Sequence, residues 1–251
     1  MSTFAWDGTQ FVPASTPSGK LRVADSWRQT NGHVRRIDLH QQRFSHSTAQ
    51  YGYRVNGSAL FTAAVELIPA EGEWFPRLSL VEDTVYLDIR PGPERRQALT
   101  VQVLPPGDPR TNPRVKGPDL ARTGALIADA AKAGAHEVLF RDEQGLVLEA
   151  GYAALVWWDG EALCVPTPEL PVLPSVTRLV VEQRAHELGV PVRQVAARLA
   201  ELDGCEAWLL NAYQGIRYVT DWVGADITPG APQRFTSWRE FLDGQLTPVH
   251  Q

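Results

Sequence analysis

Residues 104–113 read LPPGDPRTNP and divide the chain near its middle. Proline fixes its own φ angle and has no backbone N–H, so this run is unsuited to a helix interior or a central strand. We therefore predict an interdomain linker at 105–115. It would separate a small N-terminal α+β domain at 1–104 from a larger C-terminal domain at 116–251.

The N-terminal part is predicted to mix strands and helices. Two strands within 20–38 flank Asn31-Gly32, a residue pair that favours a tight hairpin turn. The spacing of apolar residues predicts helices over 39–51 and 58–67. Three further strands are expected, at 77–80, 85–90 and 101–104.

The C-terminal part is also predicted to be mixed. Asp119 is placed to cap a helix that runs to about Ala133, with Gly134 as its stop signal. Strands are expected at 137–140, 146–149, 154–158, 162–165, 207–210 and 216–219, and helices at 175–188, 192–202 and 238–242. Because helices and strands do not alternate regularly, we expect a mixed α+β architecture in two parts.

Composition narrows the class of protein. The 251 residues are 43% apolar and 21% charged, as in an ordinary globular protein, and the net charge of −5 argues against a protein that mainly grips nucleic-acid phosphates. The chain shows neither a long apolar run nor a basic, apolar leader, so we expect a soluble cytoplasmic protein with no membrane partner. Cys164 and Cys205 lie far apart, which predicts reduced thiols rather than a disulfide or a zinc site.

Motif searches remove several reaction classes. The sequence contains no GxGxxG, GxxxxGK[ST], HExxH or GxSxG. The six histidines are scattered, and we expect no metal site. Lysines are scarce: only Lys20, Lys116 and Lys132 are present, so few side chains can serve as an amine nucleophile.

Six short segments carry residues that could act together. They include an arginine on a predicted helix, a lysine after the proline-rich run, a glutamate at a strand end, a Ser-Val-Thr helix start and an Asn-Ala pair after a strand. The segments are LHQQRF at 39–44, KGPDL at 116–120, AGAHEVL at 133–139, GLVLE at 145–149, LPSVTR at 173–178 and LNA at 210–212.

In this order the segments resemble motifs of the fold-type IV pyridoxal 5'-phosphate (PLP) enzymes, the class IV aminotransferase family. That family includes branched-chain and D-amino-acid aminotransferases and aminodeoxychorismate lyase. Its corresponding motifs are H-x-x-R-L, K-x-x-N-L, A-G-x-x-E-x-L, G-x-V-x-E, L-P-G-I-T-R and, in the lyase branch, T-N-A. The resemblance covers roughly residues 21–220 and implies a two-domain fold like that of D-amino-acid aminotransferase, with the cofactor bound by 116–251.

The resemblance implies a role for each segment. Lys116 would form the Schiff base with PLP and move the Cα proton of the substrate, and Glu149 would keep the pyridinium nitrogen protonated. The phosphate would be held by Arg43 and by the helix start. The remaining implied cofactor-binding residues are Ser175, Val176, Thr177, Asn211 and Ala212.

The resemblance also implies the substrate and the assembly. A small amino-acid-like substrate would bind in the N-terminal half, where Trp27, Arg28, Arg77 and Arg90 could meet an aromatic ring or carboxylates. The protein would be a homodimer. Its reaction would be amino transfer or the β-elimination of aminodeoxychorismate lyase, and the Asn-Ala pair at 211–212 resembles the lyase branch.

The chain departs from the family pattern at three positions, and other functions stay open. Ala121 and Ala154 stand where members commonly have polar residues, and Ser175 replaces a glycine.

One alternative function is that of a catalytically silent relative that binds a ligand or partner. The other is a helix-turn-helix within 182–202 that binds nucleic acid, although an acidic and then apolar segment follows it instead of a basic recognition helix.

Overall fold

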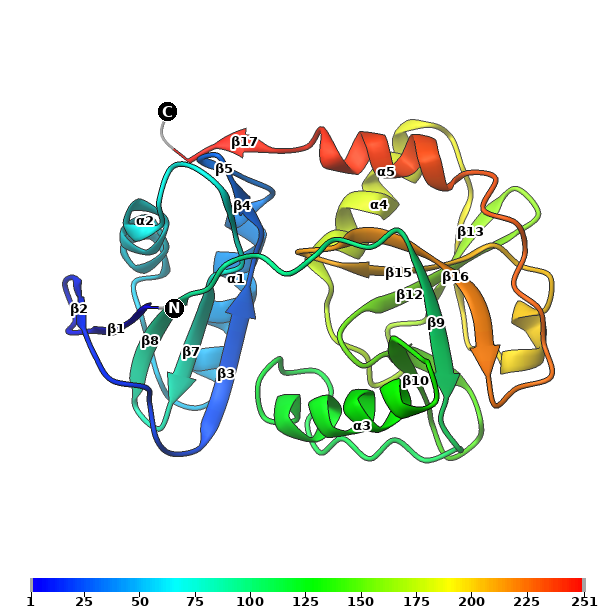
Figure 1. The fold of residues 1–251 in the computed structure, drawn as a ribbon, viewed down its shortest axis with the longest axis horizontal. Helices are drawn as coiled ribbons and strands as arrows, with labels where there is room; N and C mark the ends of the chain where they lie inside the picture. The colour runs from blue at the N-terminus through cyan, green and yellow to red at the C-terminus, as the bar shows by residue number, and fades with distance from the viewer. Residues whose placement is uncertain (1, 250–251) are drawn as a thin grey trace. The chain divides into compact units, whose positions relative to one another are not determined.

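The computed structural model describes residues 2–249, which form two compact units (Figure 1). The first unit combines the chain up to Glu94 with Val115–Pro118 and the segment from Gln245 onward. The second unit consists of Arg95–Arg114 and Asp119–Gly244. This division differs from the predicted boundaries at 104 and 115, because β9 (Ala98–Val103) pairs with strands of the second unit.

The first unit contains two antiparallel sheets and two helices. Its larger sheet has the order β2-β1-β8-β7-β3, and its smaller sheet has the order β17-β5-β4-β6. The larger sheet comprises β1 (Ser2–Trp6), β2 (Phe11–Pro13), β3 (Leu21–Ser26), β7 (Arg77–Val81) and β8 (Thr84–Ile89). The smaller sheet and the helices comprise β4 (Gln29–Thr30), β5 (His33–Val34), β6 (Glu73–Trp74), β17 (Thr247–Pro248), α1 (Ile37–Ala49) and α2 (Gly57–Leu67).

The predicted turn at Asn31-Gly32 is confirmed. Both residues have positive φ angles, 46° and 70°, as a tight two-residue hairpin requires, and they join β4 to β5. The two N-terminal helices are also confirmed, with ends that shift by one or two residues. Strands β1 and β2 were not anticipated, because they are short and lack a strong alternating pattern.

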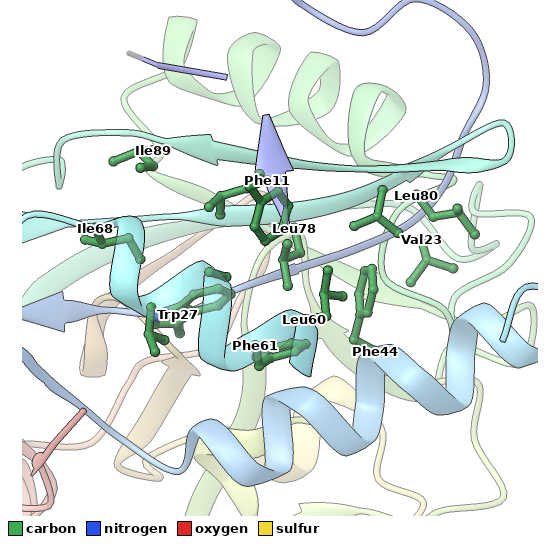
Figure 2. Close-up of a cluster of buried hydrophobic side chains, with 14 of the residues drawn as sticks. Phe11, Val23, Trp27, Phe44, Leu60, Phe61, Ile68, Leu78, Leu80 and Ile89 are labelled. Atoms are coloured by element: carbon green, nitrogen blue, oxygen red, sulfur yellow. The ribbon is translucent and has the colours of Figure 1, made fainter. Parts of the chain in front are cut away.

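The core of the first unit lies between the larger sheet and the two helices. Alternate residues of β7 and β8, such as Leu78 and Leu87, point to the same face and are fully buried. Leu60 of α2 and Phe44 of α1 complete this core, and Figure 2 shows the two side chains close together beneath the sheet. Helix α1 packs against β3, which fixes the positions of polar residues that these two elements carry.

The second unit is built on one eight-stranded sheet of mixed direction, in the order β11-β10-β9-β16-β15-β12-β13-β14. Besides β9, its strands are β10 (Glu137–Arg141), β11 (Val147–Ala150), β12 (Ala154–Asp159), β13 (Ala162–Pro166), β14 (Val192–Val195), β15 (Ala207–Asn211) and β16 (Gly215–Val223). Its helices are α3 (Leu120–Lys132), α4 (Val176–Glu187), η1 (Leu199–Leu202) and α5 (Phe235–Asp243).

Side chains alternate between the two faces of this sheet. Val138 packs under α3, whereas its neighbour Leu139 joins the apolar cluster on the opposite face. Val156 likewise faces the cluster of α4 and α5, and Leu155 faces away from it. No helix within residues 2–249 is long and apolar enough to cross a membrane.

The predicted helix at 192–202 is wrong. Residues Val192–Val195 form β14, which pairs in parallel with β13, and only Leu199–Leu202 turn, as a short 3-10 helix. Two valines after Pro191 favour an extended chain, and the free edge of β13 supplies a partner. Without a second helix, this segment is not a helix-turn-helix, so the nucleic-acid alternative loses its basis.

Candidate active site

The backbone around Lys116 is anchored in the first unit. Val115 lies in the hydrophobic core, and the Lys116 carbonyl accepts a 2.7 Å hydrogen bond from the amide of Ala24 in β3. Gly117 has φ +142°, and a Cβ atom there would lie 2.9 Å from the Cα atom of Val23. Only glycine fits both this conformation and this close approach, so the position of Lys116 depends on its neighbour.

A buried carboxylate is the centre of the charged cluster of the first unit. Asp25, at the buried end of β3, is 0% exposed. The Nε and Nη2 atoms of Arg43 each donate to it at 2.8 Å, and His40 Nδ1 lies 2.7 Å from Oδ1. His40 and Arg43 are three residues apart on α1 and therefore share one face of the helix.

Charge explains the ionisation of this cluster. Burial alone would raise the pKa of Asp25, but the charge of Arg43 and the hydrogen bonds from His40 and Arg43 outweigh it and hold the pKa of the carboxyl well below its usual range. Burial lowers the pKa of His40, so the ring is neutral near pH 7. A neutral ring bonded to a carboxylate must carry its proton on Nδ1.

Lys116 belongs to the same electrostatic environment. Burial lowers the pKa of its amine from 10.5 to about 8, and the charges of Arg43, Arg90 and Arg77 act in the same direction while Asp25 opposes them. The residue still keeps partial contact with solvent. A lysine amine with such a pKa is partly neutral under mildly alkaline conditions and can act as a nucleophile.

Two further arginines add positive charge. Arg77 pairs with Asp88 at 2.8 Å, whereas Arg90 donates from Nε to the carbonyl of Phe75 and stacks on its ring. Burial lowers the pKa of Arg90 to about 10, with a contribution from Arg77. Within residues 2–249, the hydrogen bonds of Arg90 leave its two terminal nitrogens available for an anion.

The other two predicted substrate residues are engaged in the first unit itself. Trp27 is 0% exposed and packs against Phe61, with ring centroids 5.4 Å apart. Arg28 is mostly buried and forms an ion pair with Glu73. These placements favour core packing for Trp27 and a structural ion pair for Arg28 over contact with a substrate.

The second unit contains its own buried carboxylate, Glu149 at the inner part of β11. Its Oε1 atom accepts from the amide of Leu173 at 2.9 Å and lies 2.5 Å from Nη1 of Arg110. Within residues 2–249, the hydrogen bonds to Glu149 all fall on Oε1. Burial raises the pKa of this carboxyl, and the charge of Arg110 opposes the rise.

The start of α4 lies near Glu149 in space, because the amide of Leu173, two residues before Ser175, bonds this carboxylate. Leu173, which bonds Glu149, is followed by Ser175, whose hydroxyl oxygen accepts from the amide of Arg178 at 3.2 Å. This confirms the predicted cap. Ser175, Val176 and Thr177 are all buried residues at the N-terminal end of a helix, where backbone N–H groups favour an anion.

The structure gives Asn211 a local role. Its Oδ1 atom accepts from the amides of Tyr213 and Gln214, and its Nδ2 atom donates to the carbonyl of Tyr152. The side chain therefore holds the turn between β15 and β16, and Ala212 is part of that turn. An asparagine that follows a strand and bonds the next backbone amides is typical of a turn.

The proline-rich run is not a free linker. Asp119 was expected to cap α3 with its side chain, but its carboxylate instead accepts from the amides of Thr111 and Asn112. Arg110 is buried and bonded to Asp108. Asp25, Asp108 and Arg110 were not predicted as site residues. For Asp25 alone the sequence offered a signal, because this charged residue directly follows the apolar pair Val23-Ala24 in β3.

Each unit thus brings some of the predicted residues together. In the first unit, Lys116, Arg43 and Arg90 share one electrostatic environment. In the second unit, Glu149 and the start of α4 are joined through Leu173.

Comparisons with known proteins support the predicted fold. The family model for amino-transferase class IV matches residues 22–222. A hypothetical aminotransferase from Mycobacterium tuberculosis, in a form with bound α-ketoglutarate and PMP, is 21% identical over 98% of each chain, with a TM-score of 0.84. The branched-chain amino acid aminotransferase of Escherichia coli is 17% identical over 100% of each chain, also with a TM-score of 0.84.

A third structure represents the lyase branch. A proposed 4-amino-4-deoxychorismate lyase from Legionella pneumophila is 17% identical, covers 92% of this chain and 96% of its own, and has a TM-score of 0.80. No curated protein matches the sequence. At these identities the structural likeness establishes a shared fold, which confirms the predicted fold-type IV architecture.

The close packing at Gly117 leads to a stability prediction. Replacing Gly117→Ala should lower the free energy of unfolding by about 2–4 kcal/mol, because strain at positive φ adds to a clash with β3. Gly134→Ala is the matched control: its φ is also positive, +81°, but nothing lies within 4 Å of the new Cβ atom. Urea unfolding should show a clearly smaller loss for the control, and equal losses would contradict the packing argument.

The lowered pKa of Lys116 predicts a pH dependence of stability. Between about 8 and 10.5, the unfolded chain holds a proton on this amine that the folded protein has released. The contribution of Lys116 to the free energy of unfolding therefore increases as pH rises through this window. Urea unfolding of ligand-free protein should show a steeper rise for the native sequence than for Lys116→Met; parallel pH profiles would show that the amine is not perturbed.

Proposed function

The chain belongs to the class IV aminotransferase family, and from this premise we propose that it is a PLP-dependent enzyme that transfers the amino group of an amino-acid-like substrate. The observation that carries the proposal is the amine of Lys116, a nucleophile whose pKa is lowered to about 8 within a cluster rich in cations. Nucleophilic lysines in enzymes are activated in this way, by desolvation and neighbouring positive charge.

The residues present fit PLP by their chemistry. Lys116 offers an amine for the cofactor aldehyde, and the surrounding arginines favour an anionic ligand. Glu149 offers Oε2, since its hydrogen bonds within residues 2–249 all involve Oε1. A buried carboxylate with one oxygen left over suits a protonated ring nitrogen.

The proposed mechanism assigns a task to each group. When bound, PLP supplies a pyridinium ring that accepts electrons. Lys116 would hold the cofactor and, once the substrate amine has displaced it, take the proton from the substrate Cα and return it. Glu149 would keep the ring nitrogen protonated by accepting its N–H at Oε2.

The phosphate would be held by both charge and helix geometry. The start of α4 offers the backbone N–H groups of Ser175–Thr177 and two hydroxyl groups. Arg43 would add a positive charge, although the edge formed by its Nε and Nη2 atoms already pairs with Asp25. Asn211 and Ala212 have weaker support, because the asparagine side chain holds its own turn.

The substrate carboxylate would meet Arg90. Its guanidinium is fixed by Phe75, and its terminal nitrogens are available, whereas Arg77 is paired with Asp88. Planar arginine groups bind carboxylates through two parallel hydrogen bonds. Trp27 and Arg28 contribute to the first unit's own structure instead.

The proposal extends to assembly and location. We expect a homodimer, as the family resemblance implies, with small amino-acid-like molecules as the substrates. A cytoplasmic location is in keeping with the two cysteines, Cys164 and Cys205, which are both free.

The contacts of Asn211 weaken the one sequence feature that pointed to elimination. The Asn-Ala pair was the feature that resembled the lyase branch, and the structure gives its asparagine a turn-forming role that does not distinguish the two reactions. Amino transfer is also the activity after which the matched family is named.

The first test of the function is covalent. Added PLP should give the protein a visible absorption band, and borohydride should fix the cofactor to Lys116 as a secondary amine that peptide mass mapping can locate. Lys116→Ala should abolish the adduct. Lys132→Ala, whose side chain is 77% exposed in the native protein, should retain it. An adduct on another lysine, or none, would refute the assignment.

The second test separates the reactions. Amino transfer requires a 2-oxo acid as the amino acceptor and converts an amino donor into its own 2-oxo acid, whereas elimination releases pyruvate from 4-amino-4-deoxychorismate without an acceptor. We expect acceptor-dependent turnover, which Lys116→Ala abolishes. Acceptor-independent pyruvate release would identify a lyase, and PLP binding without either reaction would identify the catalytically silent relative.

A further inference from the structure

We propose that Arg110 is a positioning residue for Glu149: it fixes one carboxylate oxygen, so that the other oxygen can accept the ring N–H of PLP. The inference rests on the proposed function, because it concerns how this chain prepares Glu149 for the cofactor. It assigns a purpose to a residue in the proline-rich run, which the sequence pattern had suggested to be a linker.

The first observation is the unequal use of the two oxygens of Glu149. Nη1 of Arg110 lies 2.5 Å from Oε1, and the amide of Leu173 donates to the same atom at 2.9 Å. Two donors on Oε1 fix the plane of the carboxylate, since rotation would break both bonds. Within the described residues, Oε2 is left without a hydrogen-bond partner and is therefore the atom that a ligand can use.

The second observation is that Arg110 is held from its other sides. Its Nε and Nη2 atoms bond Asp108 at 3.0 and 2.8 Å, and Nη2 also donates to the carbonyl of Pro171. The guanidinium lies over the ring of Phe140, 4.4 Å from its centroid. These contacts restrict the rotation of the guanidinium, so Nη1 keeps its hydrogen bond to Glu149 Oε1.

Charge supplies the third part of the argument. Burial raises the pKa of Glu149, and a neutral carboxylic acid would be a poor acceptor for a pyridinium N–H. Arg110 opposes this rise with a positive charge that is itself buried, and the charge of Arg178 acts in the same direction to a smaller extent. Arg110 also forms an ion pair with Asp108, so its positive charge is shared between two carboxylates.

A purely structural ion pair would have a different signature. If Arg110 only stabilised the second unit, its loss would lower the affinity for every ligand of the site by a similar factor. If it positions Glu149, its loss affects only a ligand with a ring nitrogen. The matched probe is 1-deazapyridoxal phosphate, in which a C–H group replaces that nitrogen while the aldehyde and phosphate remain.

The experiment measures the affinity of PLP and of 1-deazapyridoxal phosphate for the native protein and for variants. Arg110→Met should weaken PLP binding by about tenfold or more, the usual effect of losing a hydrogen bond to a charged group, and should leave the deaza affinity nearly unchanged. The pH below which PLP affinity falls should also move upward, because Glu149 loses an opposing charge. Arg193→Met, which removes an exposed ion pair with Asp159, is the control and should behave as the native protein.

Two milder variants keep the test decisive if Arg110→Met does not fold. Arg110→Lys retains the charge without the planar fork, and Asp108→Asn loosens the guanidinium while leaving it beside Glu149. Each variant should lower the affinity for PLP relative to the affinity for 1-deazapyridoxal phosphate. An unchanged ratio in the folded variants would overturn the role of Arg110 while leaving the proposed function intact. Failure of the native protein to bind PLP through Lys116 would instead refute the proposed function.

Discussion

The main constraint on this chain is the segment from Pro105 to Asp119, which must supply charged groups to both units within a short length. Arg110 belongs to the second unit and Lys116 to the first, and the chain returns to the second unit at Asp119. The carboxylate of Asp119 closes the loop by accepting the amides of Thr111 and Asn112. Prolines that cannot enter a helix or strand keep this path irregular, and ion pairs give it a fixed shape.

The buried carboxylates Asp25 and Glu149 each lie beside an arginine, but they differ in which of their oxygens stay open to a ligand. Both oxygens of Asp25 are bonded, to Arg43 and His40, and its pKa is depressed. Glu149 is bonded at one oxygen, and its pKa is raised. A saturated carboxylate stabilises its surroundings, whereas a partly bonded one in a buried place can receive a ligand.

The sequence allowed much of the fold to be predicted, because the relevant signals are local. The Asn31-Gly32 turn, the Ser175 cap and the apolar spacing of α1 each act within a few residues. The domain boundaries were less accessible, because β9 is assigned by its parallel pairing with β10 and β16, which is a contact of distant segments. Residues 192–202 were misread for the same reason, since the open edge of β13 decided their conformation.

The site was predictable only in part. Lys116 and Glu149 emerged from the order of the motifs, and their burial supports the roles assigned to them. Asp25 and Arg110 did not emerge, because an aspartate or arginine in isolation is usually a solvated surface residue. Their importance comes from partners far away in the sequence, such as Glu149 for Arg110.

We propose that Lys116 and Glu149 serve the same PLP molecule. A crystal structure of the protein grown with PLP tests it most directly. We expect continuous electron density from Lys116 Nζ to the C4' atom of the cofactor, with the ring nitrogen at hydrogen-bond distance from Glu149 Oε2. Density for PLP that is joined to another residue, or whose ring nitrogen faces a group other than Glu149, would contradict it.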